Sequence, residues 1–313
     1  MSSGKKDKIL TRDQAAAIMP QLKGLELEII ELKGGITNKL YRVKASNGGD
    51  YVFRLFGEKT EMFVDRDIEM KAMQSLQPLK ISPGVVVYLP EKRVTVIEFI
   101  DAYTLKNDDF LKEGLWEKII RPIRIVHDSS INIAKVFDPI EEVMRFYKIF
   151  KDMNLNYPEF DIEGTINILV EIDKTASVPR DDFVLCHNDL LADNFMLIND
   201  SERPGEHMYI IDWEYAGMNT PYYEIADMFQ EILVSRDIEL KLLEIYWGNR
   251  DMEKHVYMTD LFKPFPDIFW FLWSMIQLNT SKIKFDYYNY GKEKFENALS
   301  NVDYVREYYH VKI

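Results

Sequence analysis

The chain has 313 residues, enough for one large domain or for two lobes. Its 47% hydrophobic and 29% charged residues are typical of a globular protein and exclude a disordered or fibrous chain. Acidic residues outnumber basic residues by 52 to 39, and the resulting net charge of -13 argues against nucleic acid or anionic lipid as a partner.

The cysteine content and the lengths of the apolar runs indicate in which cellular compartment the protein is expected. Cys186 is the single cysteine, which excludes an internal disulfide and favours a reducing environment. Residues 1–8 lack the apolar stretch of a secretory signal, and the longest apolar run, residues 268–276, is too short to cross a bilayer. We therefore expect a cytoplasmic protein without membrane insertion.

Residues 1–100 are predicted to form a small lobe that covers a nucleotide. Thr11 and Gln14 have the spacing of a capping box ahead of a short helix that Pro20 ends. A longer helix is expected over residues 59–77. Short β-branched and aromatic runs predict an antiparallel sheet with strands at residues 27–32, 39–45, 51–56, 84–88 and 94–99.

Residues 101–313 are predicted to form a larger, mainly helical lobe that carries catalysis and substrate binding. The expected helices span residues 115–127, 140–151, 162–175, 222–234, 239–246, 266–279 and 293–309. A single β segment, residues 195–213, interrupts them. The predicted fold class is α+β and bilobal, with one helix in the sheet lobe.

Two strands inside this β segment predict a metal site. Residues 195–198 and 208–211 are expected to pair as an antiparallel hairpin. Asn194 precedes the first strand and Asp212 follows the second, so the two residues should lie side by side at the open end. An amide oxygen and a carboxylate there form the kind of site that Mg²⁺ occupies when it bridges nucleotide phosphates.

Asp189 is the candidate catalytic residue. It lies five residues before Asn194 and is placed to accept a proton from an alcohol that attacks a γ-phosphate. The order of Asp189, Asn194 and Asp212 is similar to that of protein kinases, which have His-Arg-Asp and Asp-Phe-Gly where this chain has residues 187–189 and 212–214. The alternative is that the three residues only cap turns and end a strand.

The sheet lobe offers candidate nucleotide-binding residues. Arg54 is a fixed cation inside an apolar strand, and Glu69, on the apolar face of the following helix, is its expected partner. The alternative is a structural ion pair without a role in ATP binding. Adjacent glycines would let backbone amides approach a phosphate, and residues 98–100 would contact adenine. The predicted set is Gly34, Gly35, Thr37, Asn38, Arg54, Glu69, Glu98 and Ile100.

Aromatic residues in the last third indicate a site for a cation. Trp270 and Trp273 stand three residues apart in one helix, and aromatic residues recur over residues 285–290. Aromatic faces attract cations, most strongly those that cannot donate hydrogen bonds, and Glu231 is a candidate acidic partner. Simple core packing is the alternative. The predicted substrate residues are Glu214, Glu231, Trp270, Trp273, Phe285, Tyr287 and Tyr290.

These motifs resemble those of the choline/ethanolamine kinase family, a branch of the kinase-like phosphotransferases that also includes aminoglycoside phosphotransferases. The similar blocks follow the family's order and are residues 34–38, 53–57, 59–61, 65–67, 186–190, 211–215 and 270–273. The resemblance implies a protein-kinase-like fold, ATP and Mg²⁺ as cofactors, and Asp189 as catalytic base. It also implies Asn194 and Asp212 as Mg²⁺ ligands, and Trp270, Trp273 and Tyr290 around a quaternary ammonium.

The sequence blocks differ in which members of the family they are most similar to. Residues 212–221 are most similar to bacterial choline kinases, whereas residues 59–61 and 185–191 are closer to ethanolamine kinases. Glu224 stands where the family usually has the shorter Asp, which leaves open whether it still braces the catalytic loop. His127 matches a family position that is structural.

We therefore expect ATP- and Mg²⁺-dependent phosphorylation of the choline hydroxyl, with ethanolamine as a further substrate. Mg²⁺ and Arg54 would offset the phosphate charge, and the aromatic residues would hold the alcohol in line. The alternatives are an ethanolamine kinase, an aminoglycoside phosphotransferase and a catalytically inactive kinase-like module that binds a ligand. A homodimer is left open.

Overall fold

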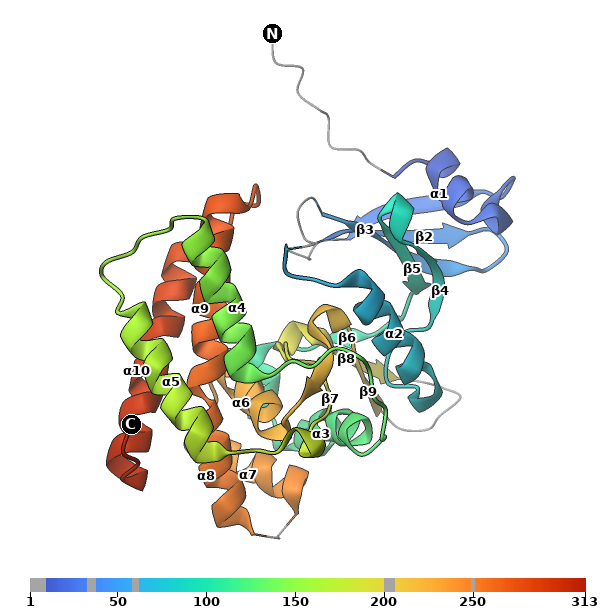
Figure 1. Cartoon of the computed structure of the whole chain (residues 1–313). Coiled ribbons are helices and arrows are strands. Elements are labelled where there is room, and N and C mark those ends of the chain that lie inside the picture. The colour runs from blue at the N-terminus through green and yellow to red at the C-terminus, as the bar shows by residue number, and fades with distance from the viewer. Residues whose placement is uncertain (1–9, 33–37, 58–61, 200–205, 249–250) are drawn as a thin grey trace. The chain divides into compact units, whose positions relative to one another are not determined.

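The computed structural model describes residues 10–32, 38–57, 62–199, 206–248 and 251–313 (Figure 1). The chain divides into two compact units, Met1–Ala102 and Tyr103–Ile313, each with its own core. The expected boundary after residue 100 lies two residues before this division. Three residues of the predicted nucleotide site, Gly34, Gly35 and Thr37, lie outside the described residues.

The first unit is built on an antiparallel sheet with the strand order β1-β2-β3-β5-β4. The capping box is present, because Thr11 accepts a hydrogen bond from the Gln14 amide and the Gln14 side chain accepts one from the Thr11 amide. The helix that follows packs on the sheet through Ala15 and Met19. The bounds are α1 Arg12–Ile18, β1 Leu27–Leu32, β2 Asn38–Ala45, β3 Asp50–Phe56, α2 Arg66–Leu76, β4 Val85–Leu89 and β5 Val94–Glu98.

The expected start of the second helix is wrong. Among the described residues, α2 begins at Arg66 rather than near residue 59. The reason is a local cap, because the Asp65 side chain accepts hydrogen bonds from the amides of Asp67 and Ile68. Glu69 lies in the first turn of α2 on its buried face, as its position predicted.

The second unit is mainly helical, and all seven predicted helices are present. The helices are α3 Glu113–His127, α4 Pro139–Asp152, α5 Ile162–Ala176, α6 Pro221–Ile232, α7 Arg236–Trp247, α8 Met252–Phe262, α9 Pro264–Thr280 and α10 Tyr287–Tyr309. In Figure 1, α4 and α10 run beside α9, and residues 264–277 of α9 are buried. No helix within the described ranges is both long and apolar enough to cross a bilayer.

Two helical predictions in this unit needed correction. Helix α8 was not predicted, because its apolar residues have no clear helical spacing and only Lys263 separates it from α9. In addition, α10 begins at Tyr287 instead of residue 293, because the Asp286 side chain accepts a hydrogen bond from the Asn289 amide and caps the helix. The aromatic residues Tyr287 and Tyr290 are therefore helical.

The β segment of this unit contains the predicted hairpin. Strands β8 Phe195–Asn199 and β9 Glu206–Ile210 pair antiparallel. Three further strands of two or three residues each were not predicted. They are β6 Tyr103–Thr104, which pairs with β8, and β7 Val184–Cys186 and β10 Gly217–Asn219, which pair with each other. Strands this short show no recognisable alternation of apolar and polar residues.

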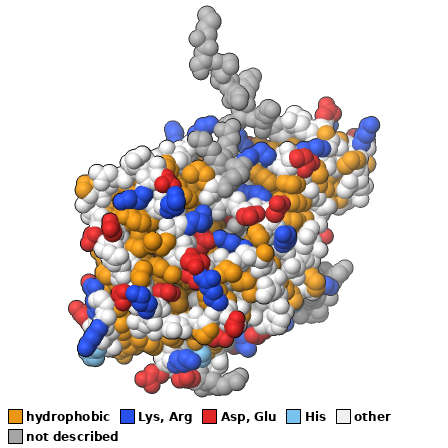
Figure 2. Space-filling model, in the orientation of Figure 1, with side chains coloured by type: hydrophobic (Ala, Val, Ile, Leu, Met, Phe, Trp, Pro, Cys, Tyr) orange, Lys and Arg blue, Asp and Glu red, His pale blue; other side chains and the backbone are white. Residues whose placement is uncertain are grey.

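Figure 2 shows acidic and basic side chains interspersed on the visible face of the molecule.

Candidate active site

The open end of the β8–β9 hairpin brings the two predicted metal ligands to one place. Phe195 pairs with Ile210, and the Ile211 amide donates a hydrogen bond to the Asn194 carbonyl at 3.0 Å. Asn194 and Asp212 therefore leave the hairpin at the same end. Asp212 has the left-handed backbone angles φ 68° and ψ 57°, a conformation that costs energy for a residue other than glycine and is common at functional sites.

The loop with Asp189 is tied to this end of the hairpin. The side-chain amide of Asn194 donates to the Asp189 carbonyl at 2.8 Å, which leaves its oxygen as the atom that could bind a metal. Burial, followed by the charges of Asp227 and Glu231, raises the pKa of Asp189 well above its usual range. Asp212 and Glu214 shift this pKa in the same direction.

This set of oxygen atoms fits Mg²⁺. An amide oxygen and carboxylates are hard ligands, and the concentration of negative charge that raises the pKa of Asp189 is of the sort that a divalent cation offsets. Asn194 and Asp212 would hold the ion. Glu214 is buried in the short helical turn Trp213–Tyr215 that follows Asp212.

His187 links the catalytic loop to the residue before Asp212. Its Nε2 atom lies 2.8 Å from the Ile211 carbonyl and donates to it, and its ring packs edge-on against Trp213 with the ring centroids 4.7 Å apart. Burial lowers the pKa of His187, so the ring is held neutral and acts as a hydrogen-bonding link rather than as a charge.

The structure answers the question about the longer side chain at position 224. The two carboxylate oxygens of Glu224 accept hydrogen bonds from the backbone amides of His187 at 2.8 Å and Asn188 at 2.7 Å. Burial alone would raise the pKa of Glu224, but His127 and His187 lower it and the carboxylate stays charged. A glutamate therefore does brace the two residues that precede Asp189.

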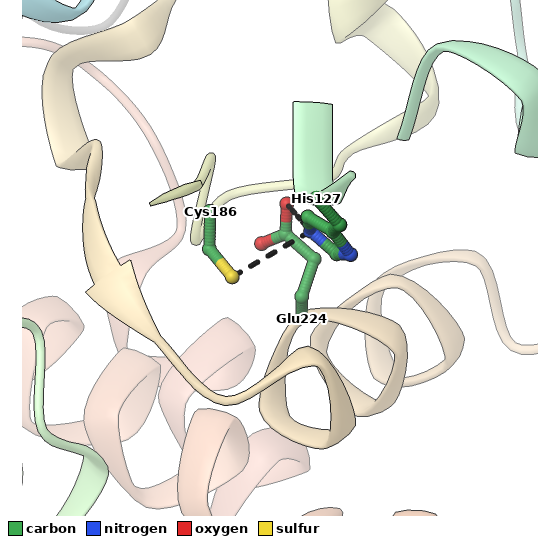
Figure 3. A group of neighbouring side chains, drawn as sticks. All are labelled: His127, Cys186 and Glu224. Carbon is green, nitrogen blue, oxygen red and sulfur yellow. Dashed lines mark hydrogen bonds and ion pairs between the residues drawn. The ribbon is translucent and has the colours of Figure 1, made fainter. Parts of the chain in front are cut away.

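Behind this brace lies a buried group of three side chains, His127, Cys186 and Glu224 (Figure 3). His127 Nε2 lies 3.6 Å from both Glu224 Oε1 and Cys186 Sγ, and His127 Nδ1 contacts the Tyr246 hydroxyl. The thiol also lies 3.6 Å from the Asn219 carbonyl, and burial raises the pKa of Cys186 well above its usual range. Each group already has a protein partner, so we assign the cluster to the brace and not to a metal.

In the first unit, the structure shows the predicted ion pair. Arg54 Nη1 lies 2.7 Å from Glu69 Oε1, and both residues are buried. A second arginine, which was not predicted as a partner, binds the other carboxylate oxygen: Arg66 Nη1 lies 2.6 Å from Glu69 Oε2. Arg66 also donates to the Asn38 side chain at 3.1 Å. Burial would raise the pKa of Glu69, but the two arginines outweigh it and the pKa is lowered.

The residues expected to contact adenine lie at the end of β5. Glu98 is exposed, and its amide donates to the Gly84 carbonyl at 2.9 Å. Ile100 follows β5 and is half-buried.

The predicted aromatic residues of the second unit meet in one cluster. Trp270 and Trp273 of α9 are 4% and 6% exposed, with ring centroids 5.7 Å apart. Trp273 contacts the rings of Tyr287 and Tyr290 edge-on, with centroids 5.8 Å and 6.4 Å away. Phe285 is 43% exposed and packs on both tyrosines. We call these five residues the aromatic cluster.

Glu231 has a partner that sequence reasoning missed. Its carboxylate lies 2.7 Å from Lys294 Nζ and accepts a hydrogen bond from the Tyr290 hydroxyl at 3.3 Å. Lys294 is buried in α10 and also lies 3.6 Å from Asp267. A lysine of the protein therefore already pairs with the acid that was the candidate partner of a substrate cation.

Sequence reasoning also missed Tyr215 and Asp227. The ring of Tyr215 lies 5.2 Å from that of Trp270, so the aromatic cluster reaches the turn after Asp212. Asp227 is fully buried in α6 between Glu224 and Glu231. The three acids stand at i, i+3 and i+7 of a mostly apolar helix, so they share one face, and this spacing was the signal that could have revealed Asp227.

An antiparallel-sheet unit, a mainly helical unit and this arrangement of Asp189, Asn194 and Asp212 are typical of phosphotransferases with a protein-kinase-like fold. The sequence profile of the choline/ethanolamine kinase family matches residues 29–254, and the chain belongs to this family. It is therefore a kinase that has an alcohol, choline or ethanolamine, as acceptor.

Known proteins similar to the chain include kinases for both alcohols. An Arabidopsis thaliana protein named "Probable choline kinase 1" is 24% identical over 301 residues, covering 86% of this chain and 85% of its own. Ethanolamine kinase 2 of Rattus norvegicus is 26% identical over 305 residues, covering 89% and 77%. The choline kinase LicA from Streptococcus pneumoniae has a similar fold, with a TM-score of 0.77, 24% identity, and 93% and 98% of the two chains covered.

Proposed function

We propose that this kinase phosphorylates choline, with ATP as the phosphoryl donor and Mg²⁺ as the metal. The observation that carries the choice of choline is the aromatic cluster beside Glu231, whose carboxylate already binds Lys294 and Tyr290. Ethanolamine is the second candidate.

Charged and amide side chains would hold the nucleotide and the metal. Asn194 and Asp212 would bind Mg²⁺, which offsets charge on the ATP phosphates when it is bound. Arg54 would contact the phosphates, because Glu69 holds its guanidinium in place through a buried ion pair. The role proposed for Arg54 is that of the strand lysine in protein kinases.

Asp189 would act as the general base. The alcohol oxygen would attack the γ-phosphorus, and the bond between this phosphorus and the leaving oxygen of ADP would break. The hydroxyl proton would pass to the Asp189 carboxylate. The brace through Glu224 keeps the loop in position for this transfer.

The hydrogen bonds around the aromatic cluster favour choline over ethanolamine. A trimethylammonium group has no N–H to donate and is attracted to aromatic faces, whereas a primary ammonium needs acceptors for three N–H groups. The nearby carboxylates already accept donors of the protein, since Lys294 and Tyr290 bind Glu231. What supports ethanolamine instead is the density of carboxylates around Asp189.

A substrate series tests the proposal. Phosphorylation rates of the purified chain, with ATP and Mg²⁺, would be compared for ethanolamine, its mono- and dimethyl derivatives, and choline. We expect kcat/KM to rise with each methyl group and to be about tenfold or more higher for choline than for ethanolamine, the effect of one favourable cation–π contact. A reversed order would assign the site to ethanolamine.

Two further outcomes would reject the proposed function. Drug resistance on expression, together with phosphorylation of an aminoglycoside, would place the chain with the aminoglycoside phosphotransferases. Absence of ADP release with every acceptor would indicate a kinase-like module that only binds a ligand.

A further inference from the structure

Asp227 connects two parts of the site that are far apart in the sequence. Its Oδ2 atom accepts a hydrogen bond from the Leu190 amide at 2.8 Å, and its Oδ1 atom accepts one from Trp270 Nε1 at 3.0 Å. Leu190 directly follows Asp189, and Trp270 belongs to the aromatic cluster. One buried carboxylate therefore contacts both the loop of the proposed base and the helix of the proposed substrate site.

We propose that Asp227 is a positioning residue that sets the placement of Asp189 relative to the aromatic cluster, and thereby aligns the alcohol with the base. This inference rests on the proposed function. Asp227 acts through Leu190 and Trp270, so its effect is on alignment rather than on proton transfer itself.

The link requires a carboxylate. Its two donors, a backbone amide and an indole N–H, are served by two different oxygens. The side chain of asparagine has one oxygen and one amide group, so it could accept only one of the two donors and would turn a donor toward the other. Burial together with Glu231 raises the pKa of Asp227 to about 7, whereas the hydrogen bonds from Trp270 and Leu190 lower it. The two donors of the link therefore favour the charged carboxylate.

Glu224 shows what is distinct about Asp227. Both acids lie on α6 and both accept backbone amides of the catalytic loop, at residues 187, 188 and 190. Glu224 also contacts His127, whereas Asp227 also binds Trp270. Glu224 therefore holds only the loop, whereas Asp227 connects the loop to Trp270 of the proposed substrate site.

The test is Asp227→Asn, assayed at fixed Mg²⁺ with choline and ATP varied separately. We expect kcat to fall up to about 100-fold and KM for choline to rise several-fold, because misplacement by about 1 Å has an effect of this size. KM for ATP should stay within about twofold of the wild-type value, since neither partner of Asp227 is a proposed nucleotide contact.

Asp260→Asn is the matched control. Asp260 is a buried aspartate of α8 that pairs with Arg236 at 2.6 Å and with Lys263 at 3.2 Å. Its replacement should lower the melting temperature and leave both KM values unchanged. If Asp227→Asn behaves in the same way, or keeps kcat and KM for choline within twofold of wild type, the inference is overturned and Asp227 is only structural.

A second variant keeps the test decisive if Asp227→Asn does not fold. Trp270→Phe removes the indole donor and keeps an aromatic ring, so it should raise KM for choline and, by loosening Asp227, also lower kcat. Where Asp227→Asn does fold, adding it to Trp270→Phe should raise KM for choline little further, because both changes remove the same hydrogen bond between Trp270 and Asp227. An unchanged kcat in Trp270→Phe, or fully additive effects on KM, would contradict the link. A wild-type chain inactive toward both alcohols would instead reject the proposed function and this inference with it.

Discussion

The catalytic loop and the aromatic cluster are held in place by different forces. The loop is fixed by directional hydrogen bonds from buried acids to its backbone, as in the contacts of Glu224 with the amides of His187 and Asn188. The rings of the aromatic cluster pack edge-on, with centroids 4.9 to 6.4 Å apart, and only Trp270 and Tyr290 among them also bind the acids of α6. Hydrogen bonds define atomic positions closely, whereas ring packing tolerates small shifts. We therefore expect damage to the loop to lower kcat and damage to the cluster to raise KM.

The largest effect should come from Asp189→Asn. The amide cannot take the hydroxyl proton, and loss of a general base typically lowers kcat by about 10² to 10⁴-fold. ATP binding, measured by calorimetry, should be unchanged because the change leaves the backbone contact with Asn194 intact. A variant that keeps more than a tenth of the wild-type kcat would remove Asp189 from the role of base.

Glu224→Gln should have the next largest effect. Glutamine has one oxygen for the amides of His187 and Asn188, so one N–H is left without an acceptor, at a cost of about 1–3 kcal/mol in the free energy of unfolding. The loosened loop should lower kcat by about 100-fold, with little change in KM for choline.

The matched control for Glu224 is Glu142→Gln. Glu142 is a buried glutamate of α4 that pairs with Lys135 and with Arg145. Its replacement should lower the melting temperature and leave kcat within twofold. If Glu224→Gln lowers only the melting temperature as well, the brace has no part in catalysis.

Much of the structure around the catalytic loop could be predicted from the sequence. Two short apolar runs and the polar turn between them predicted β8 and β9, and their pairing then placed Asn194 and Asp212 at one end. The buried pair of Arg54 and Glu69 followed from helical periodicity in the same way. Such features depend on local patterns, and local patterns are what a single sequence shows.

The features that could not be predicted depend on contacts between distant residues. Asp227 binds Leu190 across 37 residues and Trp270 across 43 residues, and no local pattern indicates either contact. The pairing of Glu231 with Lys294 likewise depends on the packing of α10 beside α6. The helix starts after Asp65 and Asp286 could have been predicted, because an Asp before a helical run is a known start signal.

On the cluster side, Trp273→Leu should raise KM for choline about tenfold and lower kcat by no more than about threefold, because a cation–π contact is lost and the loop is untouched. Leucine keeps an apolar side chain at this position. The indole N–H of Trp273 has no hydrogen-bond partner among the described residues, so the change removes no hydrogen bond there. Trp247→Leu, in α7, is the control and should leave KM unchanged. A large fall in kcat for Trp273→Leu would show that the cluster and the loop cannot be separated.

The smallest expected effect, and the sharpest check on the comparison, is that of Phe285→Leu. Phe285 lies at the exposed edge of the cluster and packs on Tyr287 and Tyr290. A solvated cation–π contact contributes about 0.5–1 kcal/mol, so KM for choline should rise about two- to fivefold with kcat and melting temperature unchanged. Tyr304→Leu, which removes a similarly exposed aromatic ring of α10, should change none of the three quantities. Equal KM values for Phe285→Leu and wild type would place the choline ammonium deeper, against Trp273 and away from this edge.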